Sequence, residues 1–427
     1  MSKFQIISLV VFGAFILVAV MVFSFSRGAG SGSASVVVWG DIPSYDWGNM
    51  MNLSGLNQDR TVSIQYVEKN SDTLASDFTE ALAEGRAPDL IVLPLEDMWS
   101  QKARIIPIPY ENVSQRDFQE TFIEGAELFL GSEGIYALPI SVDPLVLYYN
   151  RDLLTKAGIA NPIEYWDQIY TATSQLTQRD LAGNILKSAI ALGEANNIGN
   201  YKSILSLLML QAGTPITAFS TLGDLEGQLT QNFNLPAVPA ESALDFYTQF
   251  SNSTRAYYSW NRSLLPAQTH FTSGDSAYYV GFASELRILR AKNPTLNIGV
   301  STIPQSRVST SDITFGRLKG LAVSRGTSNP GAALSAVFLL VGAGPSKVLA
   351  DSMLLPPVRR DLLSERQTDA VLSVFYESAL QSRGWIDPDA RATQSTFREM
   401  IESVTSGRAR VTEAVRQGNN EINALIK

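Results

Sequence analysis

One carboxylate in this sequence, Asp143, stands where it could bind a ligand. It lies between two apolar strands expected at 135–140 and 145–149, and Pro144 follows it. A carboxylate in that position either caps a loop or faces a cleft between the two strands. An ionised carboxylate in a closing cleft must find hydrogen-bond donors, because removing it from water unpaired is costly. Ligand hydroxyl groups would supply such donors, so Asp143 is predicted to bind one.

Aromatic side chains near the ends of expected strands and helices form a second candidate set. Rings of this kind cover the flat C–H faces of sugars, while carboxylates and amides bind the hydroxyl groups. The aromatic residues predicted to contact ligand are Trp39, Tyr201, Phe282 and Trp385. Two others, Trp166 and Tyr149, lie on an apolar stripe or within an apolar strand and are expected to belong to the core. Any single one of these rings could equally belong to the core, but rings and carboxylates together are typical of a carbohydrate site.

Most enzyme chemistry lacks the residues it needs. The chain has no cysteine and one histidine, His270, in a polar segment. These counts exclude thiol nucleophiles, zinc sites of the Cys/His type and paired-histidine metalloprotease motifs. The sequence also has no phosphate-binding glycine-loop motif. We predict no catalytic residue, no metal and no cofactor. One enzymatic alternative stays open, a glycan-active enzyme that uses two of Asp41, Glu96, Asp97 and Asp143, because glycoside hydrolysis needs only two carboxylates.

Composition points to a globular protein that does not bind nucleic acid. Hydrophobic residues make up 45% of the 427-residue chain, which is enough to bury a large core. The 33 Lys and Arg against 41 Asp and Glu give a net charge of −8, with no dense basic block. A protein that neutralises phosphates needs a basic surface, so nucleic acid is excluded as a partner.

The N-terminus predicts a membrane anchor. No charged residue interrupts the apolar run from Phe4 to Phe25, and as a helix it would span about 33 Å, enough to cross a bilayer. Lys3 before it and Arg27 after it place the N-terminus in the cytoplasm and the remainder outside. We expect a single-pass cell-membrane protein whose anchor comprises 1–27, with a flexible linker at 28–35. The alternative is a cleaved signal peptide, whose apolar region is usually shorter.

Strand and helix patterns alternate along the rest of the chain and predict an α/β fold. Buried strands are expected at 35–39, 89–93, 276–282, 296–300 and 321–323, beside the two that flank Asp143. Ser71 and Asp72 are expected to cap a helix, and Asn329 and Pro330 to begin another. Two amphipathic stripes beyond 391, broken at Ser406-Gly407, predict a closing helix pair. Alternation of this kind implies a mainly parallel sheet, and the length implies two lobes.

An ordered set of motifs resembles one known family. The segment 136–154 reads YALPISVDPLVLYYNRDLL, and an asparagine-proline helix start with a Trp-Asp pair follows it. Four further segments agree, in the same order: VVVWGDIP at 36–43, GRAPDLIVLP at 85–94, FTSGDSAYYVGFA at 271–283 and LKGLAVSRGTSNPGAALSAVFLLV at 318–341. Together they resemble the bacterial extracellular solute-binding proteins of family 1, the maltose-binding-protein-like receptors of ABC importers.

This resemblance implies a fold and a division into domains. The implied fold is periplasmic-binding-protein-like, with two α/β lobes that close on a ligand about a hinge. The N-terminal lobe would comprise 36–142 and 320–365, and the C-terminal lobe 143–319 and 366–427. The resemblance also assigns ligand contact to Trp39 and Asp41 at the end of the first strand, and to Glu96 just after the strand in GRAPDLIVLP.

The same resemblance assigns Asp143 to the hinge and Phe282 and Trp385 to the aromatic edge of the site. The sequence departs from the family pattern at two points. Phe282-Ala283 stand where a platform tryptophan is usual, and a transmembrane helix replaces the usual lipid-bearing cysteine.

The implied function is that of a monomeric binding protein that captures a carbohydrate and presents it to ABC permease subunits. A membrane-anchored sensor or adhesin with the same fold is the main alternative, since the departure at the anchor leaves the partner open. Within the binding class, iron would want clustered tyrosines, whereas Tyr148 and Tyr149 point to opposite faces of their strand. A polyamine ligand, which would want several acids beside aromatic rings, stays open.

Overall fold

The computed structural model describes residues 34–58, 61–307, 309 and 311–426. The predicted anchor at Phe4–Phe25 lies outside the described residues. Among those described, no single helix is long and apolar enough to cross a membrane; the adjoining helices at 330–340 and 343–353 reach that length and composition only together, across a 62° bend.

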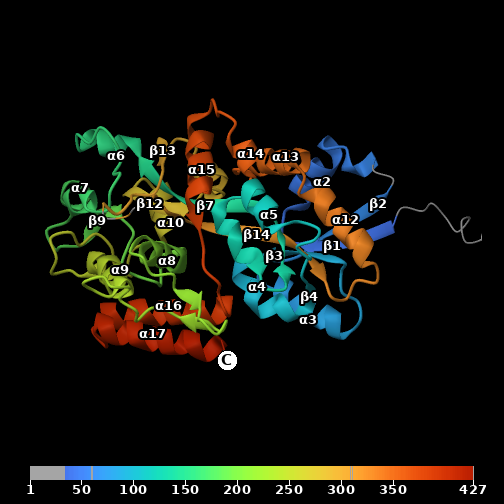
Figure 1. Cartoon of the computed structure of the whole chain (residues 1–427). Helices are drawn as coiled ribbons and strands as arrows, with labels where there is room; N and C mark the ends of the chain where they lie inside the picture. Colours follow the sequence, from blue (N-terminus) through green and yellow to red (C-terminus); the bar gives the residue numbers. More distant parts are fainter. Residues whose placement is uncertain (1–33, 59–60, 308, 310, 427) are drawn as a thin grey trace, which may run out of the picture.

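Two hydrophobic cores divide the molecule into two lobes, which lie side by side in Figure 1. The first core begins at Val36 and includes Val142, and the second begins at Leu145 and includes Phe397. We call the bodies around them the first lobe and the second lobe. This two-lobed α/β architecture is the predicted fold, while the numbered domain boundaries above stay a prediction.

Short helices and strands build the first part of the chain. They are β1 Ala34–Gly40, α2 Ser44–Leu53, β2 Val62–Glu68, α3 Leu74–Ala83, β3 Leu90–Pro94, α4 Leu95–Gln101, β4 Ile105–Ile106, α5 Gln115–Thr121, β5 Leu130–Gly131, β6 Gly134–Ile135 and β7 Leu138–Asn150. In this part 3₁₀ helices occur at Leu56–Gln58, Lys102–Arg104 and Glu124–Phe129.

The middle of the chain supplies most of the second lobe. It comprises α6 Arg151–Lys156, α7 Gln168–Leu176, β8 Gln178–Arg179, β9 Ile185–Ile190, α8 Tyr201–Gln211, β10 Thr217–Phe219, β11 Leu225–Gly227, α9 Pro239–Thr248, a 3₁₀ turn Gln249–Ser251, α10 Ala267–Thr272, β12 Ser276–Phe282, α11 Glu285–Lys292 and β13 Ile298–Ser301.

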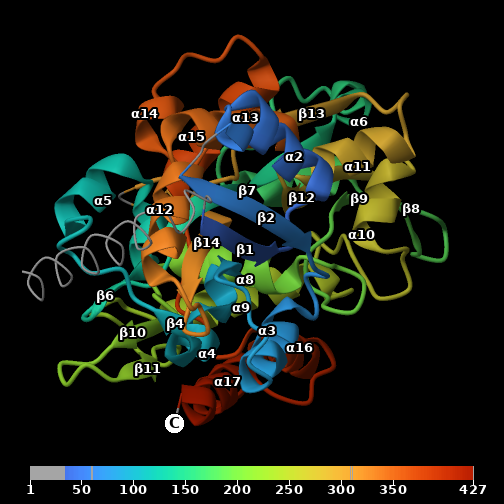
Figure 2. The ribbon, with the colours of Figure 1, turned by 90° about the vertical axis from the view of Figure 1, so that its right-hand side faces the viewer.

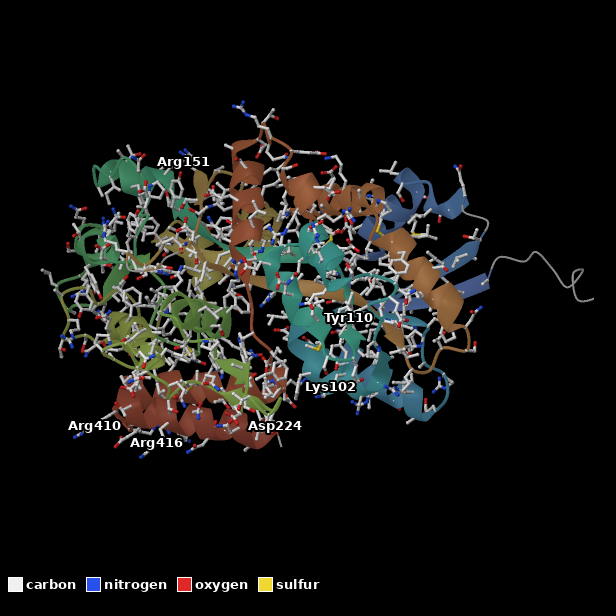
Figure 3. The ribbon with its side chains drawn as sticks, viewed as in Figure 1. Lys102, Tyr110, Arg151, Asp224, Arg410 and Arg416 are labelled. Carbon is white, nitrogen blue, oxygen red and sulfur yellow. The ribbon has the colours of Figure 1, made fainter. Side chains whose placement is uncertain are left out.

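The last part returns to the first lobe and then to the second. It comprises β14 Thr314–Ser324, α12 Pro330–Leu340, α13 Ala343–Met353, α14 Arg360–Leu363, α15 Ala370–Gln381, β15 Ser382–Arg383, α16 Ala390–Thr405 and α17 Val411–Ile426. The predicted cap is confirmed at α12, where the Asn329 side chain accepts from the Ala332 N–H and Pro330 begins the helix. The predicted C-terminal helix pair is also confirmed: α16 and α17 pack together with the break at 406–407. Arg416, on α17, and Arg410, just before this helix, lie at the outer edge of the second lobe (Figure 3).

One continuous sheet runs through both lobes in the order β2-β1-β3-β14-β7-β12-β9-β8. Strands β1, β2 and β3 are parallel, as are β12 and β9, but β14 pairs antiparallel with both β3 and β7. The sheet is therefore mixed, and the expectation of a mainly parallel sheet is wrong at its centre. Figure 2 shows β1 and β2 in front of this central part.

The two strands expected around Asp143 are one strand. β7 continues through Ser141–Pro144, because β14 pairs with it along this stretch, with Pro144 opposite Gly316 and Asp143 opposite Arg317. Since proline has no N–H to donate, an isolated segment with Pro144 would favour a break. Pairing with β14 overrides that preference, and β7 and β14 both pass from one core to the other.

A second difference lies at α3. Ser71 and Asp72, the predicted caps, do not cap this helix. The N-cap residue is Thr73, whose side chain makes no capping hydrogen bond, and Ser71 and Asp72 precede it in an exposed turn. These two residues are free to line the cavity described next.

Candidate functional site

A cavity of about 490 Å³ lies between the two lobes. The first lobe, the paired crossing strands β7 and β14, and the second lobe each supply part of its wall. The polar and aromatic residues that line it are Asp41, Ser71, Asp72, Glu96, Asp97, Ser141, Asp143, Lys202, Ser203, Ser284, Phe315, Arg317, Lys319, Trp385, Asp387 and Gln394. This position, where strands of both lobes end, is where open α/β sheets bind ligands.

Asp143 occupies the crossing strand β7 and already has hydrogen-bond donors. Its Oδ1 accepts from the Ser284 N–H at 3.0 Å and its Oδ2 from the Ser284 hydroxyl at 2.6 Å. Burial nevertheless raises the pKa of Asp143, outweighing these two bonds and the nearby Arg317. The carboxylate thus ties the start of α11 to the hinge while it lines the cavity. It is a cap, one of the two alternatives predicted; ligand contact by the same group stays a prediction.

Arg317 is an exposed cation on the cavity wall. It lies opposite Asp143 in the β7–β14 ladder, and its guanidinium sits over the ring of Phe282, 3.8 Å from the ring centroid. The described residues place no carboxylate within ion-pair distance of it. A guanidinium held against a ring keeps its N–H donors directed outward, available to hydroxyl or carboxylate oxygens.

Lys319, two residues further along β14, forms an ion pair with Asp41. The ammonium donates to Asp41 Oδ2 at 2.7 Å, and the Asp41 side chain is only 9% exposed. Its other oxygen, Oδ1, is buried and accepts no hydrogen bond from the described residues. Alternate residues of a strand face the same side, which is why Arg317 and Lys319 both face the cavity.

On the second lobe, Lys202 and Asp387 form a saturated ion pair. Lys202 Nζ donates to Asp387 Oδ2 at 2.6 Å, to the Thr393 hydroxyl at 2.8 Å and to the Ala390 carbonyl at 3.1 Å. Burial raises the pKa of Asp387, and Lys202 and Thr393 oppose that effect. All three ammonium donors are used, so this pair holds the segment after β15 against α8 and α16.

Trp385 lies in the same wall. It is 5% exposed, its indole N–H donates to the Ser206 hydroxyl at 3.2 Å, and its ring stacks on Phe397 with 5.9 Å between centroids. Lys202 lies 5.5 Å from its centroid. Only an edge of the indole reaches the cavity.

Two carboxylates at the start of α4 lack such partners. Glu96 is exposed and Asp97 half-buried, and no side-chain hydrogen bond or ion pair joins either to another described residue. Burial, and after it the negative charges of Glu96 and Asp387, raise the pKa of Asp97 to about 7, although Lys202 opposes them. Since like charges and burial both disfavour the ionised form, this carboxyl group titrates near neutral pH.

The two lobes also touch beside the cavity. The guanidinium of Arg391, on α16, donates to the main-chain carbonyl of Asp72 in the turn before α3. Because Asp72 lines the cavity and belongs to the first lobe, this bond joins the two walls directly.

Four of the predicted ligand-binding residues line the cavity: Asp41, Glu96, Asp143 and Trp385. The other three lie elsewhere. Trp39 is half-buried against the first core with the Lys69 ammonium 3.9 Å over its ring. Tyr201 is 2% exposed and donates to the Gln394 carbonyl at 2.8 Å. The ring of Phe282 is fully buried beneath Arg317.

The reason differs for each of these three aromatics. Tyr201 and Lys202 are consecutive on α8, about 100° apart around the helix, and it is Lys202 that faces the cavity. Phe282 ends β12, where both faces of the sheet are covered. Trp39 is within β1 and does not line the cavity, whereas Asp41 lies just beyond the end of this strand and does.

Sequence reasoning missed the three cations, Lys202, Arg317 and Lys319, together with Asp387. The signal for two of them was present, since Arg317 and Lys319 interrupt an otherwise apolar strand at a spacing of two. Nothing local marks Lys202 and Asp387, which are brought together across 185 positions. Among the described residues, no three His, Asp or Glu side chains are placed to share a metal ion. His270 is buried beside Trp260 and does not line this cavity.

Comparison with known proteins settles the family. The model of a family described as bacterial extracellular solute-binding protein matches residues 55–350. The chain belongs to this family. The resemblance inferred from the sequence motifs is therefore confirmed, and the family's members are binding proteins.

Curated relatives match over a shorter stretch. Proteins of Brucella abortus (strain 2308) and Brucella suis biovar 1 (strain 1330), each named only as a binding protein, are 30% identical over 102 residues. That stretch is 23% of this chain and 24% of theirs, so the match spans about a quarter of the relatives' length.

Solved structures resemble this solute-binding protein over nearly its whole length. A cyclo/maltodextrin-binding protein complexed with maltotetraose has a TM-score of 0.75 at 16% identity, covering 93% of this chain and 99% of its own. A cyclic alpha-maltosyl-1,6-maltose binding protein from Arthrobacter globiformis has 0.76 at 15% (93% and 100%). The GacH receptor of Streptomyces glaucescens, solved unliganded and with acarbose, has 0.69 at 18% (92% and 98%). At these identities the likeness establishes the fold.

Proposed function

We propose that this protein is the extracytoplasmic receptor of an ABC importer, which captures a carbohydrate between its two lobes and presents it to membrane permease subunits. The observation that carries the proposal is the inter-lobe cavity, whose wall combines carboxylates, hydroxyls, an amide and an indole edge. Solved structures of this fold hold maltotetraose and acarbose, which supports a sugar as the ligand class.

The cavity has the groups that a polyhydroxylated ligand needs. Arg317 and the hydroxyls of Ser71, Ser141 and Ser203 can donate hydrogen bonds to a ligand, and the Gln394 side-chain amide can both donate and accept them. Asp41 Oδ1 accepts nothing at present and is buried, so a ligand hydroxyl at that oxygen would satisfy it. Asp143 is placed to accept from a ligand only through lone pairs that Ser284 leaves unused.

Closure of the lobes on the ligand is the proposed working motion. The crossing strands β7 and β14 would bend, and ligand would favour the closed form by bonding to both walls. The proposed ligand contacts are Asp41, Glu96, Asp143 and Trp385 from the sequence prediction, joined by Arg317. We further propose that the predicted helix at Phe4–Phe25 tethers a monomeric receptor at the outer face of the cell membrane.

The test is a ligand screen on the purified full chain. Neutral sugars (glucose, maltose, maltotetraose and a cyclodextrin) are added while thermal unfolding is followed, and hits are titrated by calorimetry. At 100 times the dissociation constant, a ligand specific for the folded state stabilises it by about 2.7 kcal/mol. Arg317→Met in the cavity should weaken binding, whereas Glu111→Gln, an exposed change outside it, should not.

Two outcomes would contradict the proposal. If no sugar binds, or if binding survives Arg317→Met unchanged, the cavity is not a carbohydrate site. If a sugar binds and is recovered chemically altered, the protein is a glycan-active enzyme. Import is tested separately, by uptake of the radiolabelled ligand in cells with and without the protein. Normal uptake without it would favour a sensor or adhesin.

A further inference from the structure

Apart from Asp143, which Ser284 holds by two hydrogen bonds, the acidic groups of the inter-lobe cavity fall into two sets. Asp41 and Asp387 are neutralised by Lys319 and Lys202. Asp72, Glu96 and Asp97 have no side-chain cation partner among the described residues. All three belong to the first lobe's wall, and Arg317 on β14 is the cavity-lining cation that no described carboxylate pairs with. Unpaired charge in this cavity is therefore segregated, with an excess of carboxylate on one wall.

Glu96 and Asp97 experience this excess most directly. They are consecutive, and Asp387 and Asp389 add to the negative field at Asp97. The Lys202 ammonium has no N–H left to donate to these carboxylates, because it already gives its three hydrogen bonds to Asp387, Thr393 and Ala390. A neutral hydroxyl can hydrogen-bond to these carboxylates but leaves their mutual repulsion in place. A cationic donor removes both costs together.

A second observation independently indicates a hydrogen-bond acceptor that lacks a donor. The Asp41 side chain is nine-tenths buried in the same cavity, yet its Oδ1 accepts no hydrogen bond from the described residues. A buried acceptor without a partner is costly in a finished site. The cavity is thus short of donors on the side where the carboxylates stand.

We infer that the ligand is a carbohydrate bearing a protonated amine, bound with its ammonium group against Glu96 and Asp97 and its hydroxyl groups toward Arg317 and Asp41. This inference rests on the proposed function and specifies its substrate class. A linear polyamine fits less well, because Arg317, Lys319 and Lys202 in the lining would repel its further charges. A sugar carries one cation and several hydroxyls, which matches one acidic patch beside polar and cationic groups.

The experiment compares ligands that differ by one group. The full chain is titrated calorimetrically at pH 6.5 with glucosamine and glucose, and with cellobiose and its derivative that carries a single 2-amino group in place of one 2-hydroxyl. These pairs exchange hydroxyl for ammonium on the same backbone. We expect the amine to bind about tenfold more tightly, the difference between a charge-assisted and a neutral hydrogen bond. The preference for the amine should shrink from low salt to 0.5 M NaCl, because the Debye length falls below about 5 Å and the charges are screened.

Variants assign the preference to the carboxylates. Glu96→Gln keeps the shape and removes a charge, and Asp97→Asn keeps the shape and removes a carboxyl group that would ionise when the ammonium binds, so each should reduce the amine preference to about two- to threefold. Glu111→Gln, an exposed carboxylate outside the cavity, should leave the preference at its original value. Retention of the full preference in the double variant Glu96→Gln/Asp97→Asn would overturn the assignment to these residues.

The remaining outcomes separate this inference from the proposed function. If the neutral sugars bind as tightly as the amines, the inference fails and the carbohydrate receptor stands. If neither series binds but maltose, maltotetraose or a cyclodextrin does, the inference again fails alone, and only the absence of binding by every sugar in both tests overturns the proposed function as well. A spermidine arm completes the test, because tighter binding of spermidine than of any amino sugar would overturn the carbohydrate assignment.

Discussion

The two walls of the inter-lobe cavity treat a carboxylate in opposite ways. On the second lobe, Asp387 is 2% exposed and is held by Lys202 and Thr393 at 2.6–3.0 Å. On the first lobe, Asp97 is half-buried and has no side-chain partner among the described residues. Burial raises the pKa of both. Asp387 is thus paired with a cation of the protein, whereas Asp97 has no donor among the described residues.

The difference suits a structural role for Asp387 and the ligand-binding role that we propose for Asp97. A carboxylate whose oxygens are already satisfied gains little from a ligand, whereas losing its partner leaves a buried charge. A partly buried carboxylate without a partner lowers the stability of the fold when it ionises, because no donor offsets its loss of hydration. Variants of the paired residues should therefore change stability most, and variants of the unpaired ones should change it least or in the opposite direction.

Lys202→Met should have the largest effect. It would leave Asp387 buried without its cation and remove the bonds to Thr393 and Ala390, so the free energy of unfolding should fall by about 3 kcal/mol. Urea unfolding followed by circular dichroism measures it. Lys156→Met, at an exposed site, is the matched control. A loss for Lys202→Met no greater than for this control would show that the pair is not part of the scaffold.

Asp143→Asn tests an intermediate case, because Ser284 holds this carboxylate while it lines the cavity. The amide would turn a donor toward the Ser284 N–H or hydroxyl, leaving one of them without an acceptor. We expect stability to fall by about 1–2 kcal/mol. Asp224→Asn is the control, on an exposed turn well away from the hinge (Figure 3). An unchanged midpoint in urea would mean that the Ser284 bonds add nothing to the fold.

Asp97→Asn should have the smallest effect and the opposite sign. The folded protein keeps a proton on Asp97 up to about pH 7, whereas the unfolded chain releases it near the ordinary value of 3.8. Folding therefore takes up a proton between these values, so the contribution of Asp97 to the free energy of unfolding falls as the pH rises through this range. The groups that face it are Glu96, Asp387, Asp389 and Lys202.

The amide cannot ionise, so the variant should equal the wild type near pH 4 and exceed its stability by about 1 kcal/mol at pH 8. The full pKa difference is discounted here because the group is partly exposed. Unfolding at both pH values checks it. Glu96→Gln, at an exposed neighbouring carboxylate, should stay within about 0.5 kcal/mol of the wild type at either pH. A loss of stability for Asp97→Asn at pH 8 would mean that Asp97 has a structural partner.

The sequence alone determined the family, the alternation of strands and helices, and several local features. Asn329-Pro330 specifies the start of α12, because an asparagine cap and a first-turn proline act within a few residues. The α16–α17 pair follows from two apolar stripes with a Ser-Gly break. Asp41 and Glu96 were reached through motifs at the ends of β1 and β3. In all of these, the deciding interactions lie close together along the chain.

Only the tertiary structure decided which side chains face the cavity. Local pattern identifies Tyr201 and Lys202 as neighbours on a helix, but which of them meets the second core and which meets the cleft depends on how α8 packs. The same holds for β7, which is continuous through Pro144 only because β14 pairs with it. The ion pairs Lys319–Asp41 and Lys202–Asp387 join positions 278 and 185 apart. Contacts at such separations arise from packing and leave no periodic signal in the sequence.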